Sequence, residues 1–72
     1  MDNNIIVYTV LEVSKILRVN KNKVYDLIEA GDLHAMRLGG LKIPKPALEE
    51  FLNKYLGYDL ENPFSIVKFQ NA

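Results

Sequence analysis

The sequence predicts a small α+β domain made of three short helices and a two-stranded β-hairpin. Apolar residues recur at helical spacing in three separate segments, and a pair of glycines interrupts an extended segment between the second and the third. The chain has 72 residues, which makes one domain near the lower size limit for a fold held by a hydrophobic core alone. We therefore expect short elements around one small core.

The first helix is expected over about residues 10–17. Thr9 and Glu12 have the T-x-x-E spacing of a capping box, with Thr9 as the N-cap. The apolar residues that follow recur at helical spacing and predict one buried face: Val10, Val13, Ile16 and Leu17. Ser14 lies at the edge of that face, where a small side chain lets another helix approach.

The second helix is expected over about residues 21–29, with Asn20 as its N-cap and Gly31 where a helix ends in the left-handed conformation. Its apolar stripe consists of Val24, Leu27 and Ile28. Only three residues separate the two helices, and we expect Val19 among them to be buried in the turn. Two short helices joined by so tight a turn form a helix-turn-helix.

A β-hairpin is expected over residues 33–44, with Gly39 and Gly40 as its two-residue loop. This loop predicts three cross-strand pairs: Leu38 with Leu41, Arg37 with Lys42, and Met36 with Ile43. Like charges directly opposite each other destabilise a strand pair, and a phosphate bridging Arg37 and Lys42 would reverse that penalty. The hairpin is therefore expected to contact an anion.

The third helix is expected to begin at Pro46, a favoured first helical residue, and to end near Gly57. Its apolar stripe consists of Leu48, Phe51, Leu52 and Tyr55. Residues 5–8 and 64–69 are candidates for short strands, and the sequence leaves open whether either joins the hairpin. The chain thus divides into a domain of residues 1–56 and a C-terminal extension of residues 57–72.

The composition excludes several kinds of site. There is no cysteine and only one histidine, so we expect no disulfide, no metal site and no cofactor. His34 is expected to be an exposed strand residue, and nothing in the sequence indicates an enzyme. No segment approaches the roughly 20 apolar residues of a membrane span, and the N-terminus does not have the form of a signal peptide. We expect a cytoplasmic, nucleoid-associated protein that binds no membrane.

The formal net charge of zero conceals a segregation of charge along the chain. Residues 15–45 carry seven lysines and arginines against three acidic residues, and the rest carries two against six. Lys21 and Lys23 lie at the start of the second expected helix, where acidic residues would stabilise the helix dipole by roughly 0.3–1 kcal/mol each. Cations placed against that preference predict a bound polyanion.

The second helix of a helix-turn-helix enters the DNA major groove with its N-terminal residues. There Asn22 is suited to adenine and Asp26 to a cytosine amine, while Lys21 and Lys23 hold phosphates. Tyr25 is expected either to touch DNA or to stack on Val19 or the first helix. Asn20 suits a phosphate at the helix start, and Arg18 makes either a phosphate contact or a surface ion pair.

The order of helix-turn-helix, glycine hairpin and closing helix resembles the excisionase-like branch of the winged-helix, MerR-related DNA-binding domains. The likeness covers about residues 8–56 and is carried by YTVLEVSKILRVNKNKVYDLIEAGDLHAMRLGG and LKIPKPALEEFL. It implies a winged helix-turn-helix that bends DNA and helps to recruit a recombinase. Arg18 stands where the family often has glycine, and the short tip at Gly39–Gly40 implies that the wing contacts the DNA backbone rather than the depth of the minor groove.

The sequence therefore predicts a protein that binds double-stranded DNA, with an excisionase of a mobile element as the first interpretation and a small transcriptional regulator as the second. An integrase is the implied protein partner. The expected DNA-binding residues are Arg18, Asn20, Lys21, Asn22, Lys23, Tyr25, Asp26, Arg37 and Lys42.

A further alternative is a protein-interaction module that works through the apolar side chains of the extension. These are Tyr58, Phe64, Ile66, Val67 and Phe69. We expect them to pack back and enlarge the small core. In the other interpretation they join neighbouring protomers on DNA or bind the recombinase.

Overall fold

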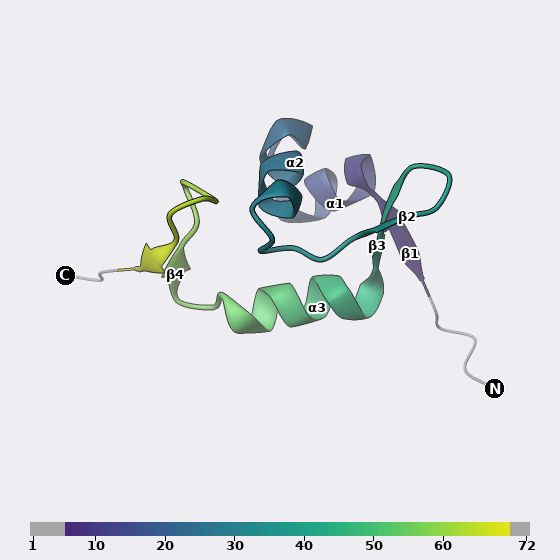
Figure 1. Ribbon diagram of the computed structural model, residues 1–72. Coiled ribbons are helices and arrows are strands. Elements are labelled where there is room, and N and C mark those ends of the chain that lie inside the picture. Colours follow the sequence, from purple (N-terminus) through teal and green to yellow (C-terminus); the bar gives the residue numbers. More distant parts are fainter. Residues whose placement is uncertain (1–5, 70–72) are drawn as a thin grey trace.

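The computed structural model describes residues 6–69 and has an α+β fold with three helices and a small antiparallel sheet, as expected for a winged helix-turn-helix (Figure 1). The predicted fold class is confirmed. The elements are β1 (Val7–Thr9), α1 (Val10–Leu17), α2 (Lys21–Glu29), β2 (Met36–Arg37), β3 (Leu41–Pro44), α3 (Lys45–Lys54), β4 (Tyr58–Asp59) and β5 (Val67–Lys68). Within the described residues, none of the helices has the length and apolar character needed to cross a membrane.

Both helices of the helix-turn-helix begin at the predicted caps. Thr9 Oγ1 accepts a hydrogen bond from the Glu12 backbone N–H at 3.1 Å, and Glu12 Oε1 accepts one from the Thr9 N–H at 2.8 Å. Asn20 Oδ1 accepts from the Lys23 N–H at 3.0 Å. Each cap satisfies backbone donors that a helix start would otherwise leave unpaired, so the polar residues ahead of each apolar stripe fix the helix starts.

The inner face of α1 differs from the predicted stripe at one position. Ile16 is exposed, whereas Ser14 is only 5% exposed, with its hydroxyl donating to the Leu11 carbonyl at 2.6 Å. α1 and α2 pack against each other, and the burial of Ser14 agrees with the predicted close approach of another helix at this small side chain. The larger Ile16 therefore stays outside the contact.

The turn between the helices contains a residue in the left-handed conformation. Arg18 has φ +61° and ψ +43°, and its N–H and that of Val19 both donate to the Ser14 carbonyl. Val19 is 37% exposed, so the expectation that it is buried in the turn is wrong. The space between the helices is already filled by Val13, Val24 and Leu27, which leaves Val19 at the edge of the core.

The hairpin is part of a three-stranded sheet in the order β1-β3-β2. The strand expected near residues 5–8 is observed at Val7–Thr9 and pairs with β3, a point that the sequence left open; residue 5 lies outside the described residues. Ile43 lies opposite Tyr8 and is completely buried. β1 thus pairs with the edge of the central strand β3 that does not face β2. We call β2, β3 and their loop the wing.

The predicted hairpin register is wrong by one residue. Arg37 lies opposite Leu41 and Met36 lies opposite Lys42, so the loop has three residues rather than two. Leu38 donates its N–H to the Gly40 carbonyl at 2.8 Å, and Gly39 and Gly40 have φ of +63° and +114°. A glycine pair suits loops of either length, so the loop residues alone do not determine the register. The slip of one residue turns the side chains of β2 to the other face of the sheet.

α3 begins one residue before the predicted start and closes the core. Pro44 occupies the N-cap position, Pro46 is the second helical residue, and the Lys45 N–H donates to the Ile6 carbonyl at 2.8 Å. The helix buries Leu48 and Phe51, while Leu52 stays exposed, so the apolar stripe is narrower than expected. Among residues 6–69, the core consists of Val10, Val13, Val24, Leu27, Leu33, Ile43, Leu48 and Phe51.

The extension forms a separate antiparallel pair, β4 with β5, beyond the end of α3 and far from the wing (Figure 1). The strand expected within residues 64–69 is confirmed at Val67–Lys68, although it pairs with β4 and not with the hairpin. Phe64, Val67 and Phe69 are 59%, 56% and 57% exposed, so the expectation that they enlarge the core is wrong. Phe51 and Leu48 already cover this side of the core. The extension contacts the core through the partly buried Leu60, and Pro63 of the extension is also buried.

Candidate nucleic-acid interface

The start of α2 is exposed and electropositive. Lys21 and Asn22 are exposed, and the first turn of the helix contains no acidic residue. The Asn20 side chain caps the Lys23 N–H, which leaves the N–H groups of Lys21 and Asn22 directed out of the helix start. These two N–H groups and the helix dipole together favour an anion at this end.

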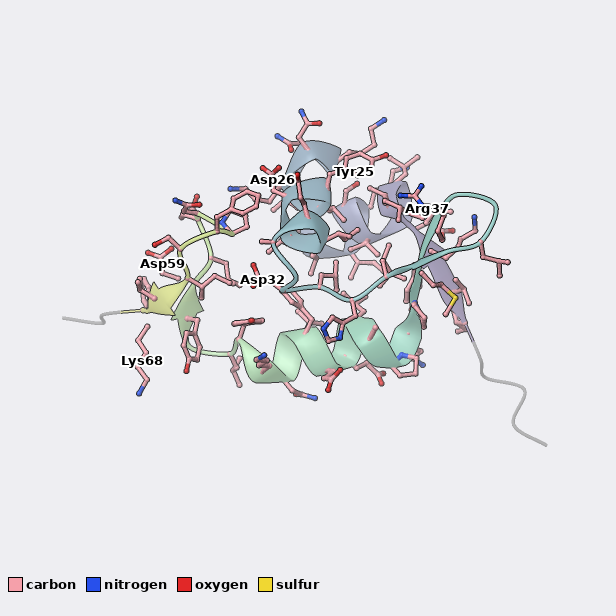
Figure 2. The ribbon with its side chains drawn as sticks, in the orientation of Figure 1. Tyr25, Asp26, Asp32, Arg37, Asp59 and Lys68 are labelled. Atoms are coloured by element: carbon pink, nitrogen blue, oxygen red, sulfur yellow. The ribbon has the colours of Figure 1, made fainter. Side chains whose placement is uncertain are left out.

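A hollow of about 430 Å³ lies between α2, the start of α1 and the wing. Three of the predicted DNA-binding residues line it, namely Lys21, Tyr25 and Arg37. In Figure 2, Tyr25 lies on α2 facing the wing, and Arg37 lies on the side of the wing next to α2. Residues far apart in the sequence therefore meet around one hollow with two cations on its walls.

Tyr25 forms the wall between the two cations. It is 45% exposed and lines the hollow together with the first residues of α1. A half-exposed tyrosine offers an apolar ring to the protein and a hydroxyl to the solvent. Tyr25 therefore lines the hollow together with Val10 and Leu11 and keeps part of its side chain exposed, and its contact with DNA stays a prediction.

The hairpin register explains why Arg37 reaches α2. Because Arg37 lies opposite Leu41, it shares the sheet face that turns toward the helices. Lys42 lies opposite Met36 on the other face, where its Nζ donates to the Gly39 carbonyl at 3.1 Å. The structure therefore does not bring Arg37 and Lys42 together, and the like-charge penalty expected for that pair does not arise.

Lys23 turns away from the hollow. Its Nζ donates to the Glu61 backbone carbonyl in the extension at 2.6 Å, and its side chain borders an apolar groove with Val19 and Leu60. Residues two apart on a helix point about 200° apart, so Lys21 and Lys23 do not share a face. The groove has a volume of about 270 Å³.

The other predicted residues lie around these features. Asp26 is half-buried on α2, one turn beyond Asn22 (Figure 2). Arg18 is exposed in the turn, and no carboxylate of residues 6–69 lies within 4.0 Å of its guanidinium. The alternative of a surface ion pair for Arg18 is thus not observed in this part of the chain.

His34 lies in an extended segment just before β2 rather than in a strand. Its Nδ1 is 4.0 Å from Glu50 Oε1, and both side chains are largely exposed. An exposed pair at this distance contributes little to stability. Across residues 6–69, no group of three or more histidine, aspartate or glutamate side chains is arranged to hold a metal ion.

Sequence reasoning missed the wall of the hollow that belongs to α1. Leu11 lines the hollow beside Thr9 and is exposed, although it is a large apolar residue. Leu11 falls outside the apolar stripe of α1, and a large apolar residue at such a position could have indicated this wall from the sequence. An apolar side chain on a helix face turned away from the core is a candidate for contact with another molecule.

Residues 7–55 match a protein family described as a helix-turn-helix domain. The match begins with β1, includes the hollow between α2 and the wing, and ends at Tyr55, just before β4. No curated protein and no solved structure matches the chain. The family therefore covers about two thirds of the sequence and leaves out the extension.

Proposed function

Since the chain belongs to the family of helix-turn-helix domains, whose members bind DNA in a sequence-specific manner, we propose that it binds double-stranded DNA as an architectural protein of the excisionase type. The contact surface consists of the exposed start of α2 and the neighbouring face of the wing. In this role the protein bends DNA at a recombination site and positions an integrase, without catalysing strand exchange itself.

One observation carries the proposed DNA surface: Lys21 and Arg37 lie on two walls of one hollow, although 16 positions separate them in the sequence. Each of these two cations can contact a phosphate of a DNA backbone that passes between α2 and the wing. Tyr25 and Leu11 supply apolar contact beside them. The same hollow has no carboxylate among its lining residues.

The roles within this surface differ in kind. Lys21 and Arg37 hold phosphates from the two walls of the hollow, and Lys42 holds one from the other face of the wing, near its tip. Arg18 and Asn20 contact the backbone at the turn. Asn22 and Asp26 face the base edges, where an asparagine pairs with adenine and an aspartate accepts from cytosine. Lys23 joins the phosphate contacts when its ammonium group leaves the Glu61 carbonyl.

The excisionase role is supported by the order of the elements, which resembles that family over the body of the chain. A small transcriptional regulator would use the same residues on DNA and is the second candidate. The two are separated by supplying the purified protein to an integrase with an attachment-site plasmid, and in parallel to a promoter reporter. An excision factor bends the site by tens of degrees in a permutation assay and changes the direction of recombination, whereas a regulator changes transcription alone.

A role in protein assembly has its own support. Phe64, Val67 and Phe69 remain exposed on an extension that the family match does not include. Exposed apolar side chains grouped on one segment favour contact with another protein. We propose that this surface holds a neighbouring protomer or the integrase on DNA. Replacing Phe69 by serine tests it, because cooperativity or integrase recruitment falls while the affinity of a single protomer for one site stays the same.

A further inference from the structure

A second hollow lies where the end of α2, the end of α3 and the extension meet. Its volume is about 420 Å³, and its lining includes Ala30, Asp32, Lys54, Tyr55, Tyr58 and Phe64. Figure 2 shows Asp32 at the lower end of α2 toward the extension, well away from Tyr25 and Arg37. This hollow shares no lining residue with the proposed DNA surface. Four of its eight lining residues lie outside the family match, namely Tyr58, Pro63, Phe64 and Ile66.

The carboxylate of Asp32 has one oxygen without a partner. Oδ1 accepts a long hydrogen bond of 3.4 Å from the Tyr55 hydroxyl. Oδ2 is buried and has no hydrogen-bond partner among residues 6–69. Buried polar groups in folded proteins are nearly always paired. Asp32 lines the hollow, while Oδ2 itself has almost no exposed surface, so a donor in the hollow reaches this oxygen when the carboxylate turns toward it.

The walls of this hollow suit a cation. The Tyr55 and Tyr58 rings meet edge to face with centroids 5.8 Å apart, and the half-exposed Phe64 ring lines the hollow with them. The Lys54 ammonium already lies 5.3 Å from the centroid of the Tyr55 ring. Ala30, the C-cap of α2, brings the negative end of the helix dipole to the same place.

We propose that this hollow binds the guanidinium group of an arginine side chain from a partner protein. A planar guanidinium stacks on aromatic rings and donates to a carboxylate at the same time, which matches a lining carboxylate with an unpaired oxygen and aromatic walls. Lys54 is the resident cation at the rim and competes with the incoming one. The inference does not depend on DNA binding.

The test is a titration of the full-length ¹⁵N-labelled protein with N-acetyl-arginine-N-methylamide, followed by NMR. The matched ligand is the citrulline derivative, which has the same shape and no charge. We expect the arginine probe to shift the signals of Asp32, Tyr55 and Phe64, and the citrulline probe to bind about tenfold or more weakly. Equal binding of the two probes, or shifts confined to other regions, overturns the proposal.

Variants assign the binding to named groups. Asp32→Asn keeps the shape and should weaken arginine binding about tenfold or more, whereas Glu49→Gln removes the same charge from the exposed face of α3 and should change nothing. Phe64→Ala, on an exposed side chain, should weaken binding about two- to fivefold, and Lys54→Met should strengthen it about two- to fivefold. If Asp32→Asn does not fold, the opposite effects of Phe64→Ala and Lys54→Met on arginine binding still test the proposal. Binding unaffected by either of these two variants contradicts the proposal, and a lysine probe that binds as tightly as arginine contradicts the choice of guanidinium.

Discussion

Arg37 lies directly opposite Leu41 in the wing, and this single pairing directs its guanidinium toward α2. The alternative pairing with Lys42 would have placed Arg37 on the outer face of the sheet with that lysine. With the observed register, Arg37 shares a hollow with Lys21, and the phosphate contacts of α2 and the wing become parts of one surface.

Replacing Lys21 or Arg37 by alanine should weaken binding to similar extents on all DNA sequences. Each proposed phosphate contact contributes about −0.9 to the slope of log K against log salt. The full-length protein should show a slope of about −3.6 if Arg18, Lys21, Arg37 and Lys42 contact phosphates, and each alanine variant should reduce it by about one. Lys54→Glu, on α3, is the control and should leave DNA affinity nearly unchanged. If Lys54→Glu lowers DNA affinity as much as the Lys21 or Arg37 variants do, the proposed DNA surface is wrong.

Replacing Asn22 by alanine should act on specificity rather than on overall affinity. Loss of an asparagine–adenine pair should cost about 1–3 kcal/mol on the preferred site, with little loss on random duplexes. Asn53→Ala, on the exposed side of α3, is the matched control. The preferred site is first selected from random DNA. The affinities of each variant for this site and for random duplexes are then compared by competition binding at one salt concentration. Equal losses on selected and random DNA would show that Asn22 does not contact bases.

Replacing Arg18 by glycine should raise stability and, because the proposed backbone contact is lost, lower DNA affinity. Arg18 has φ +61°, a conformation that costs roughly 1–2 kcal/mol for residues other than glycine. Because glycine also loses more backbone entropy on folding, we expect a net gain of about 0.5–1 kcal/mol in the free energy of unfolding. Chemical denaturation measures this gain. Lys15→Gly, inside α1, should instead lower it by about 1 kcal/mol.

Truncation after Gly57 tests the proposed division between residues 1–56 and 57–72. The extension buries Pro63 and covers part of the core through Leu60, so we expect a modest fall in melting temperature rather than loss of folding. The truncated protein also lacks Glu61 and leaves Lys23 free. Lys23→Ala should then reduce the salt slope by about one in the truncated protein and by less in the full chain. Identical effects in both backgrounds would mean that the extension does not restrain Lys23.

Local signals in the sequence predicted the helices well. Thr9 and Asn20 are caps whose hydrogen bonds form within three residues, and such interactions do not depend on the rest of the fold. The positions of Lys21 and Tyr25 on the N-terminal part of α2 could be predicted for the same reason, because this part of the helix follows from its cap and apolar stripe. The ends of α1 and α2 agree with the expected ranges.

Long-range choices could not be predicted in this way. The glycine pair at residues 39–40 permits loops of two or three residues, and nothing local to the pair distinguishes the observed pairing of β2 with β3 from the predicted one. Lys23 and Glu61 are 38 residues apart, so nothing near Lys23 indicates its partner. The exposure of Phe64 likewise depends on how completely α3 covers the core, which an apolar pattern does not reveal.

The hydrogen bond from Lys23 to Glu61 connects the helix proposed to meet DNA with the part of the chain that the family does not share. If a phosphate takes the ammonium group, the extension loses one of its attachments to the body. Thermodynamic linkage then requires reciprocity: a protein that holds the extension in its present position lowers the affinity for DNA by the same factor by which DNA lowers the affinity for that protein. A partner protein that draws the extension away from α2 has the opposite effect and raises the affinity for DNA.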